Sequence, residues 1–100
     1  MNSKQRAYLK GLAVNLDTIF QIGKGGVTDE TVHQISNALE ARELIKIRVL
    51  ETSPQNIADI SRELSLKTNA EVVQTIGTKL VLYKVSSNEK NRKIDISKIR

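Results

Sequence analysis

The most specific chemical feature of the sequence is a glycine-rich loop, Gly23-Lys24-Gly25-Gly26, between a β-prone run and a helix-like segment. An anion accepts hydrogen bonds from main-chain N–H groups only when it comes within about 3 Å of them. Glycine has no Cβ to obstruct that approach, and it reaches the positive φ angles that turn successive N–H groups toward one anion. Lys24 adds a mobile positive charge. The loop therefore predicts a phosphate-binding site, while glycines also mark ordinary turns.

The helix after this loop restricts where an anion can sit. Thr28 is a good N-cap, and Asp29 and Glu30 fall in the first turn, where the helix dipole favours acidic side chains. The free N–H groups of a helix N-terminus attract anions, but two carboxylates there repel them. We therefore expect a phosphate on the loop side, near Lys24 and Gly25, and not on the helix axis.

Other chemical sites find little support in the sequence. The triphosphate loop pattern is absent, and Thr28 stands where the dinucleotide fingerprint requires glycine. His33 is the only histidine and is expected on the exposed side of its helix with Asn37, so no serine, histidine and acid set can be assembled. With no cysteine and no clustered carboxylates, the sequence predicts no enzyme, no metal site and no cofactor.

The elements that must position the loop follow from hydrophobic periodicity and turn residues. The sequence predicts helices over 3–14 and 28–42, a third helix that starts at Ser53-Pro54, and strands over 18–22, 44–50, 70–76 and 79–85. Gly77-Thr78 is expected to form the last hairpin turn. This order, α-β-α-β-α-β-β, predicts an α/β fold of the α+β kind, a two-layer sandwich with a four-stranded mixed sheet.

The second predicted strand alternates strictly. Ile45, Ile47 and Val49 are expected on its buried face, and Lys46 and Arg48 on the other. Aromatic residues are scarce, and Phe20 and Tyr83 are expected in the core. Base stacking on exposed aromatics is therefore not the predicted means of recognition, which leaves backbone and shape.

Positive charge is concentrated at the two ends of the chain. The net charge is +5, and residues 1–12 and 86–100 hold the whole excess. This predicts one domain over residues 1–85 and a basic tail over 86–100. A basic excess attracts a polyanion, although it also serves solubility in a disordered tail. Without an apolar stretch of about 20 residues or a signal sequence, we expect a cytoplasmic monomer with no membrane contact.

Several blocks of sequence, in order, resemble one known family, the CRM domain (chloroplast RNA splicing and ribosome maturation). The blocks are Tyr8–Ala13, Ile22–Thr28, Ala38–Lys46, Val73–Gly77 and Leu80–Tyr83. The stand-alone bacterial YhbY-type members are the most similar. The resemblance covers about residues 3–85.

The resemblance implies an RNA-binding domain whose fold is similar to the C-terminal domain of translation initiation factor three. It also implies that the loop acts like the Gly-x-x-Gly loop of KH domains, which clamps nucleic-acid backbone. Bacterial single-domain members are linked to precursors of the large ribosomal subunit. Thr78 departs from the family, because many members carry a basic residue there.

The predicted RNA-binding residues combine the loop with basic side chains on the first helix and the sheet: Gly23, Lys24, Gly25, Gly26, Arg6, Lys10, Lys46 and Arg48. Lys79 and Lys84 are weaker candidates. Ribosomal RNA or a large-subunit precursor is the expected partner. The alternatives are an adapter that docks on the ribosome or another acidic partner, with a purely structural glycine loop, and a nucleotide-binding enzyme.

Overall fold

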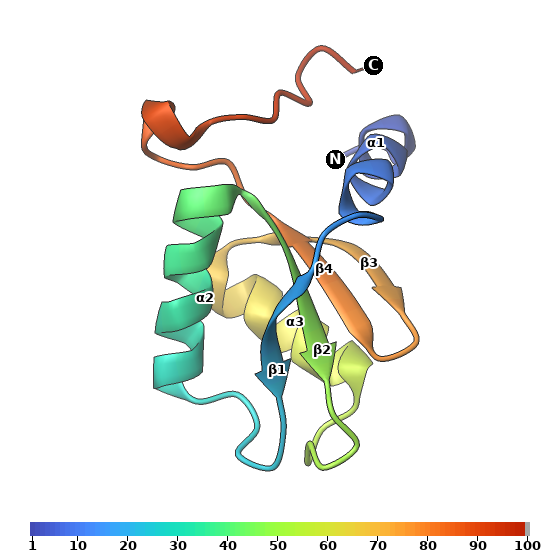
Figure 1. The fold of residues 1–100 in the computed structure, drawn as a ribbon, viewed down its shortest axis with the longest axis vertical. Coiled ribbons are helices and arrows are strands. Elements are labelled where there is room, and N and C mark those ends of the chain that lie inside the picture. The colour runs from blue at the N-terminus through green and yellow to red at the C-terminus, as the bar shows by residue number, and fades with distance from the viewer. Residues whose placement is uncertain (100) are drawn as a thin grey trace.

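A four-stranded mixed sheet forms the centre of the molecule, with helices on both of its faces (Figure 1). The computed structural model describes residues 1–99. In chain order the elements are α1 Ser3–Ala13, β1 Thr18–Ile22, α2 Asp29–Arg42, β2 Leu44–Val49, α3 Ile57–Thr68, β3 Glu71–Ile76, β4 Lys79–Tyr83 and the 3-10 turn η1 Glu89–Asn91. The predicted fold class and element order are confirmed.

The strand order β1-β2-β4-β3 decides which loops meet. β1 pairs with β2 in parallel, and β4 runs antiparallel to both β2 and β3. The loops that follow β1 and β2 therefore lie at the same end of the sheet as the Gly77-Thr78 hairpin. Main-chain hydrogen bonds join the three segments: Leu50 N–H donates to the Ile22 carbonyl at 2.8 Å, and Val49 N–H to the Thr78 carbonyl at 2.7 Å. The glycine loop is anchored at this end.

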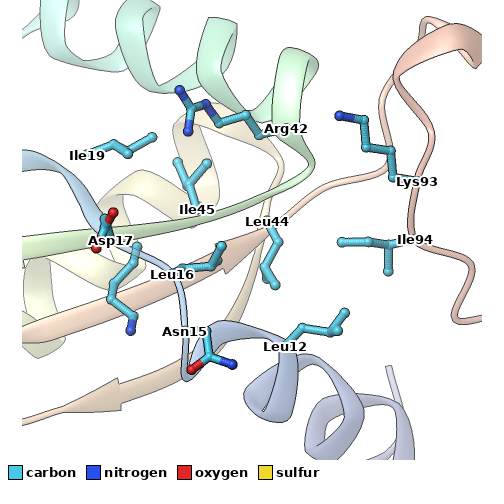
Figure 2. Close-up of a pocket in the computed structure, with 11 residues that line it drawn as sticks. Leu12, Asn15, Leu16, Asp17, Ile19, Arg42, Leu44, Ile45, Lys93 and Ile94 are labelled. Carbon is cyan, nitrogen blue, oxygen red and sulfur yellow. The ribbon is translucent and has the colours of Figure 1, made fainter.

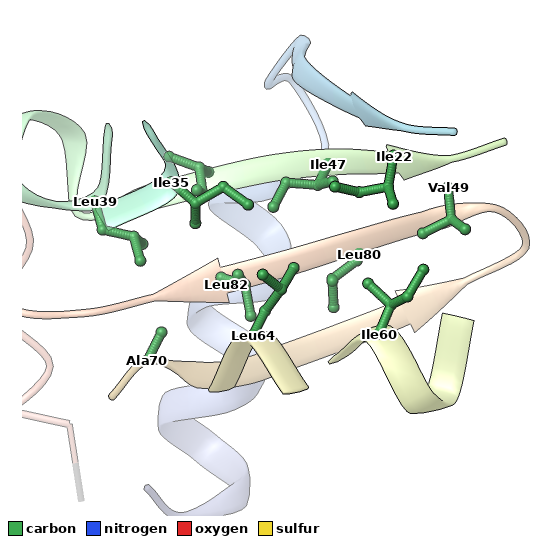
Figure 3. Close-up of a cluster of buried hydrophobic side chains, with 11 residues drawn as sticks. Ile22, Ile35, Leu39, Ile47, Val49, Ile60, Leu64, Ala70, Leu80 and Leu82 are labelled. Atoms are coloured by element: carbon green, nitrogen blue, oxygen red, sulfur yellow. The ribbon is translucent and has the colours of Figure 1, made fainter. Parts of the chain in front are cut away.

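The larger core lies between the sheet and helices α2 and α3 (Figure 3). Both helices place a stripe of aliphatic side chains against the strands. The buried residues are Ile22, Ile35, Leu39, Ile45, Ile47, Val49, Ile60, Leu64, Ala70, Leu80 and Leu82. The prediction that alternate residues of β2 share one buried face is confirmed.

A smaller core lies on the opposite face of the sheet, under α1. Leu9 and Ala13 of α1 pack there against side chains of β2, β3 and β4, namely Leu44, Val73, Val81 and Tyr83. The two-layer description therefore holds for the sheet with α2 and α3, and α1 adds a partial third layer. Lys46 and Arg48 of β2, which alternate with the residues of the larger core, fall on the α1 face.

Side-chain caps set the starts of the first two helices. Asn2 caps α1 in a reciprocal arrangement with Gln5, whose N–H donates to Asn2 Oδ1 at 2.8 Å. Thr28 caps α2 as predicted, because its hydroxyl accepts the N–H of Thr31 at 3.1 Å. Local sequence alone therefore fixed the start of the helix that follows the glycine loop.

The predicted start of the third helix at Ser53-Pro54 is wrong. The helix begins at Ile57, and the side chain of Asn56 caps it by accepting the N–H of Asp59 at 2.9 Å. The Ser53 hydroxyl instead donates to the Gln55 carbonyl at 2.8 Å and closes a local turn. A serine hydroxyl stabilises such turns as well as helix starts, so the local sequence permitted both outcomes.

The segment after β4 folds back on the domain. Ile94 and Ile96 pack against the smaller core, and the Gln5 side-chain amide donates to the carbonyls of Ile96 and Ile99 at 2.9 and 3.1 Å. Ile99 N–H donates to the Ile96 carbonyl at 3.0 Å and closes a single turn. The sequence did not predict the contacts that hold this segment to α1 and α2.

Candidate functional site

The glycine loop forms a closed turn with an open corner. Gly26 N–H donates to the Gly23 carbonyl at 2.9 Å, which leaves Lys24 and Gly25 at the corner, both exposed. Within residues 1–99 no protein acceptor takes the main-chain N–H of Lys24 or of Gly25. Two adjacent amides and one lysine are therefore free to bind a ligand from solvent.

The three glycines of the loop have different structural roles. Gly26 has φ 64°, and an added Cβ would lie 3.3 Å from Pro54. A Cβ on Gly23 would lie 3.3 Å from Leu50 and Thr52 of the neighbouring loop. Gly25 has nothing within 4 Å and no positive φ. The positive φ expected for this loop is therefore found at Gly26, and Gly25 is the glycine that the fold does not require.

The start of α2 favours ligand binding at this corner over the helix axis. The Thr28 hydroxyl already occupies the N–H of Thr31, one of the amides that a helix N-terminus could offer an anion. Asp29 and Glu30 are exposed in the first turn, as predicted. Their negative charges repel an anion on the helix axis. The binding of a phosphate near Lys24 therefore remains a prediction.

Four cationic side chains gather on the α1 face of the sheet. Lys10 of α1, Lys46 of β2 and Lys79 of β4 line one depression beside the helix. Arg48 lies opposite Lys79 in the β2–β4 register, so both belong to the same face. Arg48 also pairs with Gln21 at the end of β1, which places it toward the glycine loop. The fold therefore joins residues that are far apart in sequence into one basic surface.

Two other predicted cations lie outside this group. Arg6 is half-buried one turn before Lys10 on α1 and does not line the depression. Lys84 follows β4 at the opposite end of the sheet from the glycine loop, where its N–H donates to the Glu43 carbonyl at 2.9 Å. The structure therefore brings Lys10, Lys46 and Arg48 together with Lys79, and it leaves Arg6 and Lys84 apart.

His33 and Tyr83 occupy the positions expected of them, whereas Phe20 is only partly buried. His33 is exposed on α2, with its Nε2 3.3 Å from the Asn37 side-chain amide. Tyr83 is buried, and this burial, with the nearby Glu43 and Asp95 carboxylates, raises the pKa of its phenol. Phe20 packs at the margin of the larger core. The strands described here thus present no pair of exposed aromatic rings for base stacking.

The sequence missed a second concave region at the other end of β1. Arg42 at the end of α2 and Lys93 of the C-terminal segment line it, although they lie 51 positions apart. Only their charge could have drawn attention to them, because no motif contains both. Within residues 1–99 the structure contains no helix long and apolar enough to cross a membrane.

Comparisons with known proteins give a consistent result. The family model of the CRS1/YhbY (CRM) domain matches residues 1–84. The chain is 44% identical over 90 residues to the probable RNA-binding protein YqeI of Bacillus subtilis, covering 90% of this chain and 94% of that protein. It is 38% identical over 90 residues to an RNA-binding protein of Haemophilus influenzae, and the match covers 90% of this chain and 91% of that protein.

A solved structure is also similar. The solution structure of the hypothetical protein SAV1595 from Staphylococcus aureus superposes with a TM-score of 0.77 at 41% identity. The match covers 95% of this chain and 99% of the other.

Proposed function

We propose that this chain, which belongs to the CRS1/YhbY (CRM) domain family, binds RNA and holds its phosphate backbone at the loop Gly23–Gly26. The single observation that carries the proposal is the exposed corner of that loop, where the amides of Lys24 and Gly25 have no acceptor within residues 1–99. The names of the related RNA-binding proteins support the same class of ligand.

The proposed contact is between main-chain donors and one phosphate. The two free amides donate to its oxygens, and the Lys24 ammonium adds a full charge beside them. The basic surface of Lys10, Lys46, Arg48 and Lys79 takes neighbouring phosphates. Since phosphate contacts carry no base information, sequence preference should be weak.

Ribosomal RNA is the target that we propose, in precursors of the large ribosomal subunit, as the family resemblance implies. The protein would act there by binding alone, as a cytoplasmic monomer without a cofactor. Sedimentation with large-subunit precursors from cell extracts tests this target directly. If the protein binds short RNA but does not sediment with these precursors, the proposed ribosomal target is wrong and only the proposal of RNA binding remains.

Substitution of Gly25 with tryptophan tests the loop. The side chain enters open space, so the melting temperature should stay within about 2 °C, while the bulk covers both amides. Loss of even one hydrogen bond to a charged phosphate should weaken RNA binding about 10-fold or more. Gly11→Trp is the matched control, because Gly11 also has nothing within 4 Å of an added Cβ. Fluorescence anisotropy with a labelled single-stranded RNA measures the RNA affinity of both variants.

Equal RNA affinity in folded Gly25→Trp and wild type would exclude the loop as the phosphate site.

The adapter function has one observation in its favour. Val14 and Ile76 border the depression that holds the lysines, and they are 73% and 60% exposed. Exposed aliphatic side chains suit a protein partner better than a phosphate backbone. Co-sedimentation with ribosomal particles before and after ribonuclease treatment separates the two functions, because a ribonuclease-resistant complex requires the adapter.

A further inference from the structure

A cavity of about 500 Å³ lies at the end of β1 that is far from the glycine loop (Figure 2). Its walls come from the end of α1, the start of β1, the end of α2, β2 and the C-terminal segment. The apolar lining consists mainly of Leu12, Leu16, Ile19, Leu44 and Ile94. Small-molecule sites in proteins typically measure about 300–1,000 Å³, so the cavity is large enough for one nucleotide.

Positive charge surrounds this apolar lining. Arg42, Lys46 and Lys93 reach the cavity from three different elements, whereas Asp17 is its one carboxylate. Arg42, Lys46 and Lys93 form no ion pair with any residue that the structure describes. Asn15 adds a side-chain amide. The cavity therefore combines an apolar surface, a hydrogen-bonding amide and an excess of cations.

We propose that this cavity binds one unstacked nucleotide, with its base against the aliphatic wall and its phosphate at Arg42 and Lys93. A nucleotide carries a flat, weakly polar face and a dianionic or diester phosphate in one molecule, and the cavity offers a partner for each. The Asn15 amide can pair with the polar edge of a base. As a site for RNA, the cavity depends on the proposed function.

The C-terminal segment completes the site, and Glu43 positions that segment. Glu43 is fully buried, and its Oε1 accepts the N–H of Lys93 at 2.7 Å and of Ile94 at 3.2 Å. Its other oxygen accepts the N–H of Ser86 at 2.9 Å. These bonds fix the two residues that form one wall of the cavity, so Glu43 is a positioning residue for this site.

The cavity and the glycine loop are close enough to serve one RNA strand. Both flank β1, which spans about 13 Å from Thr18 to Ile22 at about 3.3 Å a residue. β1 is an edge strand, and its outer side is unpaired within the described chain. A strand lying along this edge could place a phosphate at the loop and a base in the cavity.

Titration of the ¹⁵N-labelled full chain with adenosine monophosphate tests the proposal by NMR. The amides of Leu16, Ile19 and Ile94 should shift and saturate, and ribose 5-phosphate, which lacks the base, should bind at least about tenfold more weakly. Lys93→Glu should weaken binding of the monophosphate about tenfold or more, since it removes one charged contact. Lys90→Glu, the same change on an exposed residue of the same segment outside the cavity, should leave it unchanged.

Several results would overturn the proposal. They are shifts confined to the glycine loop, equal binding of ribose 5-phosphate, and binding at these amides of an acidic peptide but not of the monophosphate. RNA binding by the same variants separates this proposal from the proposed function. RNA affinity that Gly25→Trp lowers and Lys93→Glu leaves unchanged would reject the cavity alone. Saturable monophosphate binding in a protein that binds no RNA would reject the proposed function and keep the cavity as a nucleotide site.

Discussion

Replacing Glu43 with alanine should release the C-terminal segment from the domain. The carboxylate is fully buried where α2 ends, and it accepts main-chain N–H groups of Ser86, Lys93 and Ile94. No lysine or arginine pairs with it within residues 1–99. These amides therefore provide most of the compensation for burying its charge, and the segment depends on them in turn.

The size of the effect follows from these three bonds. A hydrogen bond to a charged group contributes about 1.5–3 kcal/mol, but the freed amides regain water when the segment detaches, and the desolvation of the carboxylate is relieved. We expect the free energy of unfolding to fall by roughly 2–4 kcal/mol. Glu43 has φ 66°, and alanine keeps the Cβ that strains the backbone in this conformation. The difference in the free energy of unfolding between wild type and Glu43→Ala therefore measures the contribution of the carboxylate.

Urea unfolding and amide hydrogen exchange measure the two consequences. Amides of residues 93–99 should lose protection in Glu43→Ala, while those of β2 and β4 keep it, and monophosphate binding in the cavity should disappear. Glu51→Ala is the control, because Glu51 is an exposed carboxylate and its loss should change stability by less than about 0.5 kcal/mol. Full protection of the segment in folded Glu43→Ala would refute the reasoning and leave Glu40, Gln5 and the packing of the two isoleucines as the anchors.

Four further predictions follow from the loop, the core and the segment. RNA affinity should fall about 100-fold between 50 and 200 mM salt, as for about five phosphate contacts, and a flat response would contradict backbone binding. In urea melts, Gly26→Ala should lower the free energy of unfolding by about 1–2 kcal/mol, because Gly26 has a φ of 64°. Gly25→Ala should leave the free energy of unfolding nearly unchanged, and equal losses in the two variants would mean that both positions are strained alike. Tyr83→Phe should raise the free energy of unfolding by about 1 kcal/mol, since the buried hydroxyl has no hydrogen-bond partner within residues 1–99, and a clear loss would show that it has one. Hydrogen bonds from Ser87, then Ser86 and Asn88, lower the pKa of Glu40 in the folded protein. Its contribution to stability is therefore complete above the ordinary carboxyl pKa of about 4.3 and is lost as the pH falls through the lower folded value. Between pH 6 and about pH 3, the free energy of unfolding measured in urea melts should drop less in Glu40→Gln than in wild type. Equal drops would mean that protonation of Glu40 does not contribute to the loss of stability in acid.

The sequence by itself determined the elements whose signals are local. The alternation of β2 fixed its buried face, the Thr28 hydroxyl fixed the start of α2, and Gly77 with φ 59° fixed the last hairpin. It also located the glycine loop, because glycines that leave amides uncovered can be recognised without their neighbours. Where the local residues allowed two outcomes, as at Ser53-Pro54, the predicted helix start was wrong.

The tertiary structure alone decided everything that joins distant parts of the chain. The pairing of β2 with β4 set Lys79 beside Lys46 and Arg48 on the face that α1 covers, and the packing of α1 brought Lys10 there but not Arg6. In the sequence Glu43 is one carboxylate among many, and only folding buries it against amides 43 to 51 positions away. Contacts of this range depend on packing in three dimensions, and periodicity along the chain carries no record of which distant segment will supply the partner.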